Sequence, residues 1–219
     1  MRKADRIQLA KKTLDALLNA FPDSCCSLDS DKPERLSIRG ILSAQCTDVR
    51  VNITAQELFA KYPSMEDILN MPDEELIRII KPCGLYKSKG KSVKAFADLY
   101  VNEWGGKVPN DVDALMKCPG VGKKISNLIV GEIYGTPAVV VDTHCKRVMY
   151  RIGITDNTDP IKVEEDICAV FPEDSWIGLG HMAVSLGRTY CTAQKPSCDT
   201  CPLTGFCAKR LPGKAGKKA

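Results

Sequence analysis

The chain has 219 residues, of which 44% are hydrophobic and 26% are charged, and its formal net charge is +4. This length suits one or two domains with a sizeable core, and the composition is that of an ordinary globular protein. No apolar run reaches the length of a membrane-spanning helix, so a membrane protein is not expected. The mild positive charge permits nucleic-acid binding but does not argue for it.

Apolar residues recur at helical spacing along most of the chain, and Gly and Pro stand mostly between the periodic segments. Only Ala138–Val141 reads as a strand, and four residues are too few to build a sheet. We therefore predict an all-α fold of short helices. The pattern predicts helices over 3–21, 48–61, 73–83, 89–104, 111–118, 123–134, 144–152 and 160–171.

A tight hairpin, Pro119-Gly120-Val121-Gly122, separates the helices predicted over 111–118 and 123–134. Its glycines allow backbone conformations closed to other residues and leave no side chain between the main chain and a partner. The hairpin amides and the N-terminus of the following helix together favour one phosphate. A simple turn between two helices is the alternative, but the hairpin followed by Lys123-Lys124 is a more specific pattern.

Four of the 11 cysteines lie close together near the C-terminus, spaced C-x6-C-x2-C-x5-C. Disulfides fit this chain poorly, because it begins without an apolar signal segment and its other cysteines form no framework. Zinc sites usually have two C-x(2–4)-C pairs, whereas iron–sulfur clusters accept varied spacing. The spacing therefore predicts a metal centre and favours an iron–sulfur cluster over zinc. The four predicted ligands are Cys191, Cys198, Cys201 and Cys207.

Taken together, the hairpin, the segment Val141-Asp142-Thr143-His144 and the cysteine run resemble the endonuclease III family of DNA glycosylases with AP-lyase activity. Leu42-Ser43-Ala44-Gln45-Cys46-Thr47-Asp48 and Gly84-Leu85-Tyr86-Lys87-Ser88-Lys89 match further family motifs. The motifs follow the family's order over nearly the whole chain. The resemblance implies a [4Fe-4S] cluster on the four cysteines. It also implies a bifunctional enzyme that removes oxidised pyrimidines from duplex DNA and cleaves the abasic site.

The resemblance places the catalytic lysine at Lys124. An amine there can attack C1′ of the sugar, form a Schiff base and permit β-elimination of the 3′ phosphate. Only the neutral amine attacks, and we expect burial and the helix dipole to favour it. A plain phosphate-binding lysine is the alternative role. Lys123 points about 100° away on the helix, so we expect it to face phosphate or solvent.

The resemblance places the catalytic carboxylate at Asp142, where it would stabilise the sugar cation or assist proton transfer. The same position also suits an ordinary helix N-cap. Gln45 is expected to fill the gap left by the extruded base, and Leu85 to wedge into the opposite strand. Further DNA contacts are expected at Lys87, Lys89, Gly120, Val121, Gly122, Lys123 and His144. Cys46, Cys118 and Lys123 stand where the family commonly has Ala, Leu and Arg.

The resemblance implies two helical lobes. One is a continuous six-helix block over about 25–136, with the hairpin at 119–122. The other, the iron–sulfur cluster lobe, combines 1–24 with 137–211, and 212–219 is expected to be a flexible basic tail. DNA would lie between the lobes. We expect the partner to be double-stranded DNA with a damaged base or an abasic site. We also expect a monomer in a prokaryotic cytoplasm, associated with the nucleoid and not with a membrane.

Two rival functions stay open. The related adenine-mismatch glycosylases share the hairpin and the cluster but typically lack a lysine at the position of Lys124. A non-catalytic helix–hairpin–helix protein would bind DNA and use its cluster structurally or as a redox sensor. The presence of both Lys124 and Asp142 disfavours the second rival.

Overall fold

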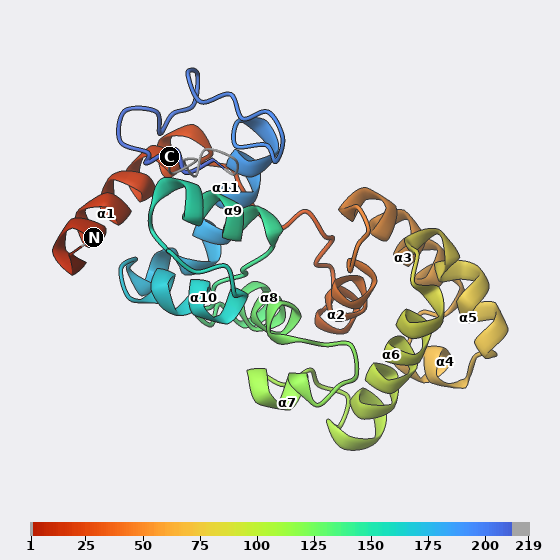
Figure 1. The fold of residues 1–219 in the computed structure, drawn as a ribbon. Coiled ribbons are helices and arrows are strands. Elements are labelled where there is room, and N and C mark those ends of the chain that lie inside the picture. The colour runs from red at the N-terminus through yellow and green to blue at the C-terminus, as the bar shows by residue number, and fades with distance from the viewer. Residues whose placement is uncertain (1, 212–219) are drawn as a thin grey trace, which may run out of the picture. The chain divides into compact units, whose positions relative to one another are not determined.

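The computed structural model describes residues 2–211 and is all-helical, with no strand among these residues, which confirms the predicted fold class (Figure 1). The predicted strand-like segment Ala138–Val141 is a connecting segment between helices. The predicted basic tail, 212–219, lies outside the described residues. None of the described helices is long and apolar enough to cross a membrane.

The chain divides into two compact units. One consists of Cys26–Thr136, and the other joins the chain up to Cys25 with the chain from Pro137 onward. We call them the hairpin unit and the cluster unit and describe each by itself.

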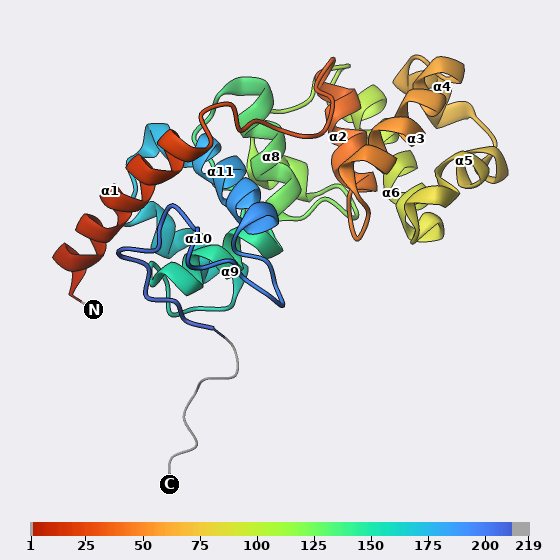
Figure 2. The ribbon, with the colours of Figure 1, turned by 90° about the horizontal axis from the view of Figure 1, so that it is seen from above.

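The hairpin unit is built around α2 (Pro33–Leu42), which packs against α3, α6 and α8. Figure 2 shows α2, α3 and α6 side by side. Gly40 allows the close approach of α8, because a Cβ at this position would lie 3.0 Å from Cγ2 of Ile125. The other elements are α3 (Asp48–Lys61), α4 (Met65–Asn70), α5 (Asp73–Ile80), the 3-10 turn η1 (Lys81–Cys83), α6 (Tyr86–Asp98), the π-helical turn η2 (Leu99–Glu103), α7 (Val112–Met116) and α8 (Lys123–Tyr134).

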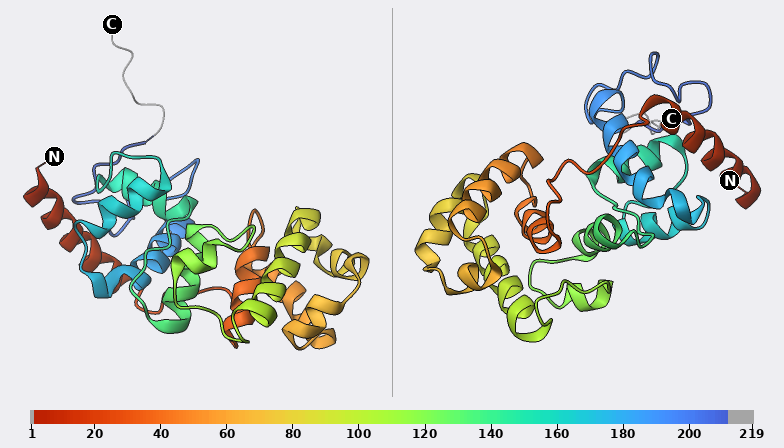
Figure 3. Two further views of the ribbon diagram at one scale, coloured as in Figure 1. Left: turned by 90° about the horizontal axis from the view of Figure 1, so that it is seen from below. Right: turned by 180° about the vertical axis from the view of Figure 1, so that it is seen from behind.

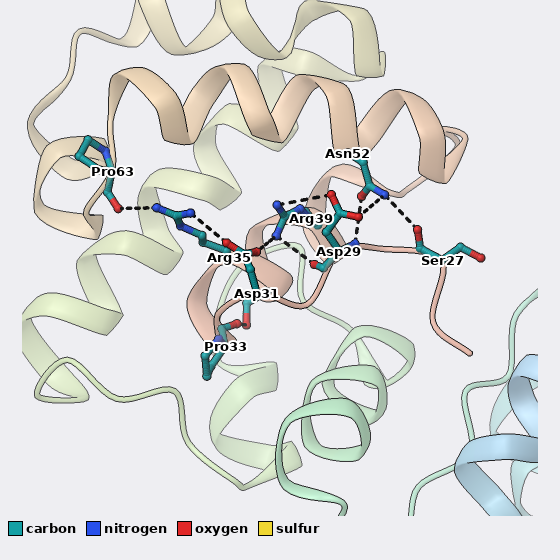
Figure 4. A network of polar contacts seen from close by, with 9 residues as sticks. Ser27, Asp29, Asp31, Pro33, Arg35, Arg39, Asn52 and Pro63 are labelled. Atoms are coloured by element: carbon teal, nitrogen blue, oxygen red, sulfur yellow. Dashed lines mark hydrogen bonds and ion pairs between the residues drawn. The ribbon is translucent and has the colours of Figure 1, made fainter. Parts of the chain in front are cut away.

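A polar network holds the segment that enters α2 (Figure 4). The Asp31 carboxylate accepts hydrogen bonds from Arg35 and Arg39, and Arg39 also donates to the carbonyl of Asp29 at 2.9 Å. Both guanidinium groups lie over the ring of Phe59. Burial alone would raise the pKa of Asp31, but the bonds from the two arginines outweigh it and lower this pKa. The network therefore fixes the start of the hairpin unit against α2 and α3.

The cluster unit is centred on α11 (Trp176–Thr189), which packs against α9 (Thr143–Ile152) and α1 (Lys3–Ala20). In both views of Figure 3 the red α1 lies beside the blue α11. Two glycines of α11 permit close packing. A Cβ at Gly180 would meet the backbone of Val140 at 3.6 Å, and a Cβ at Gly187 would lie 2.9 Å from Nδ1 of His144. The remaining elements are α10 (Pro160–Cys168) and the 3-10 turn η3 (Glu173–Ser175).

The predicted helices over 48–61 and 123–134 coincide with α3 and α8. Three helices were not predicted: α2, α4 and α11. The reason differs between them. Helix α4 has only six residues, while α2 and α11 contain glycines that local propensity counts against a helix.

Candidate active site and cluster site

The hairpin between α7 and α8 depends on Gly120. Its φ is +83°, and a Cβ there would lie 2.3 Å from Oγ of Ser92, so both the conformation and the space require glycine. Gly122 has an ordinary φ of −95° and faces open space. Val121 is the third predicted DNA contact of the hairpin. Its side chain is buried, and its N–H donates within the turn to the carbonyl of Cys118 at 3.0 Å.

The amides of Gly120 and Gly122 differ from the amide of Val121. Both glycines are exposed, and neither amide has a hydrogen-bond partner within residues 2–211. At the start of α8 the amides of Ile125 and Ser126 donate to the carbonyl of Gly122 at 2.9 and 3.0 Å. Unpaired donors at a helix N-terminus favour an anion such as a phosphate.

Helix α8 begins directly after this hairpin, and Lys124 is its second residue. The side chain of Lys124 is exposed. The expected burial of Lys124 is therefore wrong, although its place at the positive end of the helix dipole is as expected. Its neighbour Lys123 is half-buried and interacts within the chain. The more accessible of the two amines is thus the one that the sequence assigned to catalysis.

Asp142 caps α9, as its position in the sequence predicts. Its Oδ1 accepts a hydrogen bond of 2.7 Å from the backbone N–H of Cys145, and the side chain is half-buried. Cys145 is fully buried, and burial together with the Asp142 charge raises the pKa of its thiol. The cap fixes the direction of the Asp142 carboxylate.

His144 is the second residue of α9, with Nδ1 3.1 Å from Nη2 of Arg147. Because arginine only donates, Nδ1 must accept, and the ring proton then resides on Nε2. His144 can therefore donate one hydrogen bond from Nε2 to an acceptor such as a phosphate. Arg147 also donates from Nε to the carbonyl of Cys191 at 2.9 Å, which connects α9 to the loop of the first predicted cluster ligand.

Gln45 and Leu85, the two residues predicted to enter the DNA base stack, share an unusual backbone conformation. Both side chains are exposed and both residues are left-handed, with φ of 53° for Gln45 and 48° for Leu85. Within residues 2–211 only one other non-glycine residue, Lys209, has a positive φ. Such conformations cost about 1–3 kcal/mol and cluster at functional sites.

The two lysines predicted to contact phosphate next to Leu85 differ from each other. Lys87 is exposed, as the prediction requires. The side chain of Lys89 is only 4% exposed, and its amine donates to the carbonyls of Leu42 and Cys83, both at 2.8 Å.

The four predicted cluster ligands line one cavity. Burial raises the pKa of the Cys201 and Cys207 thiols, and the charges of Cys191 and Cys198 raise both further. Within residues 2–211 no group of three or more His, Cys, Asp or Glu side chains is placed to hold a single metal ion. Desolvated thiols that repel one another fit a cationic iron–sulfur centre that all four would hold.

Two N–H donors point at these sulfur atoms: the backbone of Lys209 at 3.4 Å from Sγ of Cys207, and Nη1 of Arg151 at 3.5 Å from Sγ of Cys191. Arg151 is only 3% exposed and also donates to the carbonyls of Thr192 at 2.7 Å and Ala193 at 2.9 Å. Sequence reasoning missed Arg151 and Arg147. Their i, i+4 spacing on one face of a helix was the available signal.

Comparison with known proteins gives the following similarities. Residues 38–173 match the HhH-GPD superfamily of base excision DNA repair proteins, and residues 191–207 match the iron-sulfur binding domain of endonuclease III. The chain is 40% identical to endonuclease III of Bacillus subtilis over 89% of each chain, and 35% identical to that of Synechocystis over 94% of each.

Solved structures agree. A non-covalent endonuclease III–DNA complex matches with a TM-score of 0.89 and 37% identity over 95% of this chain and 96% of that one. A trapped endonuclease III–DNA covalent intermediate matches with a TM-score of 0.88 and 37% identity over 95% and 97%. The superfamily match contains both Lys124 and Asp142.

Proposed function

The chain belongs to the endonuclease III family of base excision repair proteins, and we propose that it removes oxidised pyrimidines from duplex DNA and cleaves the resulting abasic strand with Lys124 as nucleophile. As a family member it is a DNA glycosylase with AP-lyase activity, it binds DNA, and it carries a [4Fe-4S] cluster. One observation carries the assignment of the nucleophile. Lys124 is an exposed amine in the first turn of a helix whose preceding hairpin offers unpaired amides.

The reaction follows from an amine in this position. Nζ of Lys124 attacks C1′ of the damaged nucleotide, and the bond from C1′ to the base breaks as the base leaves. Opening of the sugar ring gives an imine between Lys124 and C1′, which acidifies the hydrogen on C2′. Loss of that proton expels the 3′ phosphate, and water then releases the enzyme. Asp142, aimed by its helix cap, stabilises the cationic sugar or accepts a proton.

The proposed DNA contacts divide by chemistry. The amides of Gly120 and Gly122 and the side chains of Lys87, Lys123 and His144 supply donors for phosphates. Gln45 and Leu85, exposed on strained turns, enter the base stack when the damaged nucleotide is extruded. Oxidised pyrimidines are the lesion class that the family resemblance implies.

The cluster, when bound, cross-links the loop from Cys191 to Cys207. Arg147 and Arg151 tie this loop to α9, the helix that Asp142 caps, so this chain's own residues connect the cluster loop to the carboxylate. We further propose that the protein works as a monomer beside the nucleoid of a prokaryotic cytoplasm, since the relatives named above are bacterial.

Borohydride trapping on a duplex with a single abasic site tests this function. Wild type should give a covalent protein–DNA adduct, and Lys124→Gln should give none. Lys123→Gln is the matched control, since it removes the neighbouring amine, and it should still be trapped. A trapped Lys124→Gln protein would overturn the assignment of the nucleophile.

The two rival functions make different predictions in a second assay that measures base release. The proposed enzyme releases an oxidised pyrimidine. An adenine-mismatch glycosylase would release adenine without any trapped adduct. A non-catalytic DNA-binding protein would bind the abasic duplex, give no adduct and release no base, and that result would refute the proposed catalysis.

A further inference from the structure

The buried amine of Lys89 joins two segments of the hairpin unit. Its Nζ donates to the carbonyl of Leu42, the last residue of α2, and to the carbonyl of Cys83, the last residue of η1, each at 2.8 Å. The side chain is only 4% exposed, and a charged amine that has left water is costly unless such bonds compensate it. Lys89 therefore fixes the end of α2 to the end of η1.

The turn that presents Gln45 begins at the end of α2. A carbonyl at a helix end has no partner inside the helix, and the amide of Cys46, four residues after Leu42, donates instead to the carbonyl of Ser43 at 3.1 Å. The carbonyl of Leu42 takes its bond from Lys89. Three residues later Gln45 is exposed, with a φ of 53°. The amine of Lys89 is thus a cap for α2 at the start of this turn.

The turn that presents Leu85 is held by Lys89 at two points. Nζ binds the carbonyl of Cys83, two residues before Leu85, and the backbone N–H of Lys89 donates to the carbonyl of Leu85 itself at 3.0 Å. Gly84 and Leu85 have consecutive positive φ values of 67° and 48°. A non-glycine residue in this conformation is strained and persists only where its surroundings hold it. Lys89 supplies hydrogen bonds on both sides of the strained residue.

We propose that Lys89 is a positioning residue for base extrusion, whose single buried amine sets the spacing between Gln45 and Leu85 so that both side chains enter the base stack together. The inference rests on the proposed function, in which these two side chains fill the stack when the damaged nucleotide leaves it. Both carbonyls converge on one atom. A movement of either turn must therefore break a bond at Nζ or carry the other turn with it.

Lys94 offers a matched control on the same helix, α6. Its Nζ also donates to two carbonyls at a helix end, those of Leu69 at 2.8 Å and of Met71, and it lies 3.7 Å from the carboxylate of Asp73. These partners belong to α4 and the residues that follow it, where no contact with DNA is proposed. Lys89→Met and Lys94→Met therefore remove the same kind of bond, but only the first removes it from the two turns described above.

The test uses the intact holoprotein and two duplexes that differ at one nucleotide, which is an uncleavable abasic analogue in one and undamaged in the other. Contacts to phosphates are common to both duplexes, so the ratio of the two dissociation constants measures the preference that entry into the base stack provides. Thermal unfolding and iron content show whether each variant is folded and loaded. Should Lys89→Met not fold, Lys89→Gln takes its place, because its amide keeps a donor on a side chain that is one atom shorter.

We expect Lys89→Met to lower the preference for the abasic duplex by about tenfold, the effect of one lost contact, while its affinity for the undamaged duplex stays at the wild-type value. Lys94→Met should keep the preference even where it lowers the unfolding temperature by as much. In a protein that already carries Gln45→Ala and Leu85→Ala, adding Lys89→Met should cause no further loss, because Lys89 acts only through those two side chains.

Three results would overturn the proposal. One is a folded variant at Lys89 that keeps the wild-type ratio. Another is an equal fall of the ratio in Lys94→Met, which would mean that any loosening of the hairpin unit has this effect. The third is a further tenfold loss, of about that size, when Lys89→Met is added to Gln45→Ala and Leu85→Ala, since Lys89 would then act on another group.

The proposed function and this inference can fail separately. If wild type neither prefers the abasic duplex nor is trapped by borohydride, the proposed function fails, and the positioning role fails with it. If wild type prefers the abasic duplex and is trapped, while Lys89→Met keeps the full preference, only the positioning role is wrong and the proposed repair function stands.

Discussion

The two catalytic candidates lie on helices that are held in opposite ways. Around Lys124 the hairpin unit leaves groups unpaired: the amine is exposed, and the amides of Gly120 and Gly122 have no partner within residues 2–211. Around Asp142, in the cluster unit, the polar groups are instead hydrogen-bonded within the chain. The carboxylate caps α9, and Arg151 in the last turn of that helix is bound to the cluster loop.

This difference fits the two roles. A group that must bond to the substrate gains from being unpaired, because the substrate then supplies the missing partner. A group that must only be aimed gains from bonds that fix its direction. Substitutions at the unpaired groups near Lys124 should therefore change DNA chemistry while the fold survives, whereas substitutions that remove a hydrogen-bonded group around α9 should also change stability.

Substitution of Asp142 should have the largest effect, and it separates the orientation of this side chain from its negative charge. Asparagine caps a helix as well as aspartate does, so Asp142→Asn should leave the free energy of unfolding nearly unchanged. Without the carboxylate, the single-turnover rate of abasic-site cleavage should fall by about 10²- to 10⁴-fold. Thermal unfolding and quenched-flow cleavage of an abasic duplex measure the two effects.

Two controls accompany Asp142→Asn. Asp142→Ala removes the cap as well and should cost about 1 kcal/mol of stability. Asp159 caps α10 in the same unit by accepting from the amides of Ile161 and Lys162, so Asp159→Asn should change neither property. A full cleavage rate in Asp142→Asn would show that this carboxylate is only a cap.

Arg151→Met should have the second largest effect, on stability and iron content. The substitution keeps much of the buried volume but removes the bonds to the carbonyls of Thr192 and Ala193. Hydrogen bonds to a charged group contribute about 1.5–3 kcal/mol each, so we expect a loss of about 3 kcal/mol. Iron per chain and chemical denaturation measure it. Lys162→Met, on the exposed face of α10, is the control and should leave both unchanged. Normal iron and stability in Arg151→Met would mean that this arginine does not anchor the loop.

The sequence predicted features that depend on neighbouring residues better than features that depend on distant parts of the chain. The cap at Asp142 and the turn at Gly120 arise within a few residues, and both were predicted correctly. Helix α11 was missed because its glycines lower helix propensity locally. What favours glycine at Gly180 and Gly187 is the approach of Val140 and His144, which come from a different part of the chain.

The burial of two lysines could not be predicted from the sequence, and the reason is the same for both. Lys89 lies in a basic stretch that reads as solvated, yet carbonyls from two separate segments remove it from water. Lys124 was expected to be buried because its chemistry benefits from desolvation, but its side chain is exposed. Burial depends on tertiary packing, which local patterns do not encode.

The smallest effect should come from the two hairpin glycines, which differ within one turn. Gly120→Ala forces a side chain into a left-handed conformation and against Oγ of Ser92, so we expect it to lower the free energy of unfolding by about 1–2 kcal/mol. Gly122→Ala projects into open space at an ordinary φ and should leave stability within about 0.5 kcal/mol of wild type. Denaturant titration measures both.

In DNA affinity, by contrast with stability, Gly122→Ala should be the more affected of the two variants. In Gly122→Ala the new methyl stands beside an unpaired amide, where a phosphate would approach, so its affinity for an abasic duplex should fall although it folds normally. Ser92→Gly removes the atoms that a side chain at Gly120 would strike, so combined with Gly120→Ala it should recover the part of the stability loss due to the clash and leave the part due to φ. Unchanged affinity in Gly122→Ala would mean that DNA does not approach this amide, and the hairpin would then be a structural turn that presents Lys124 without holding phosphate itself.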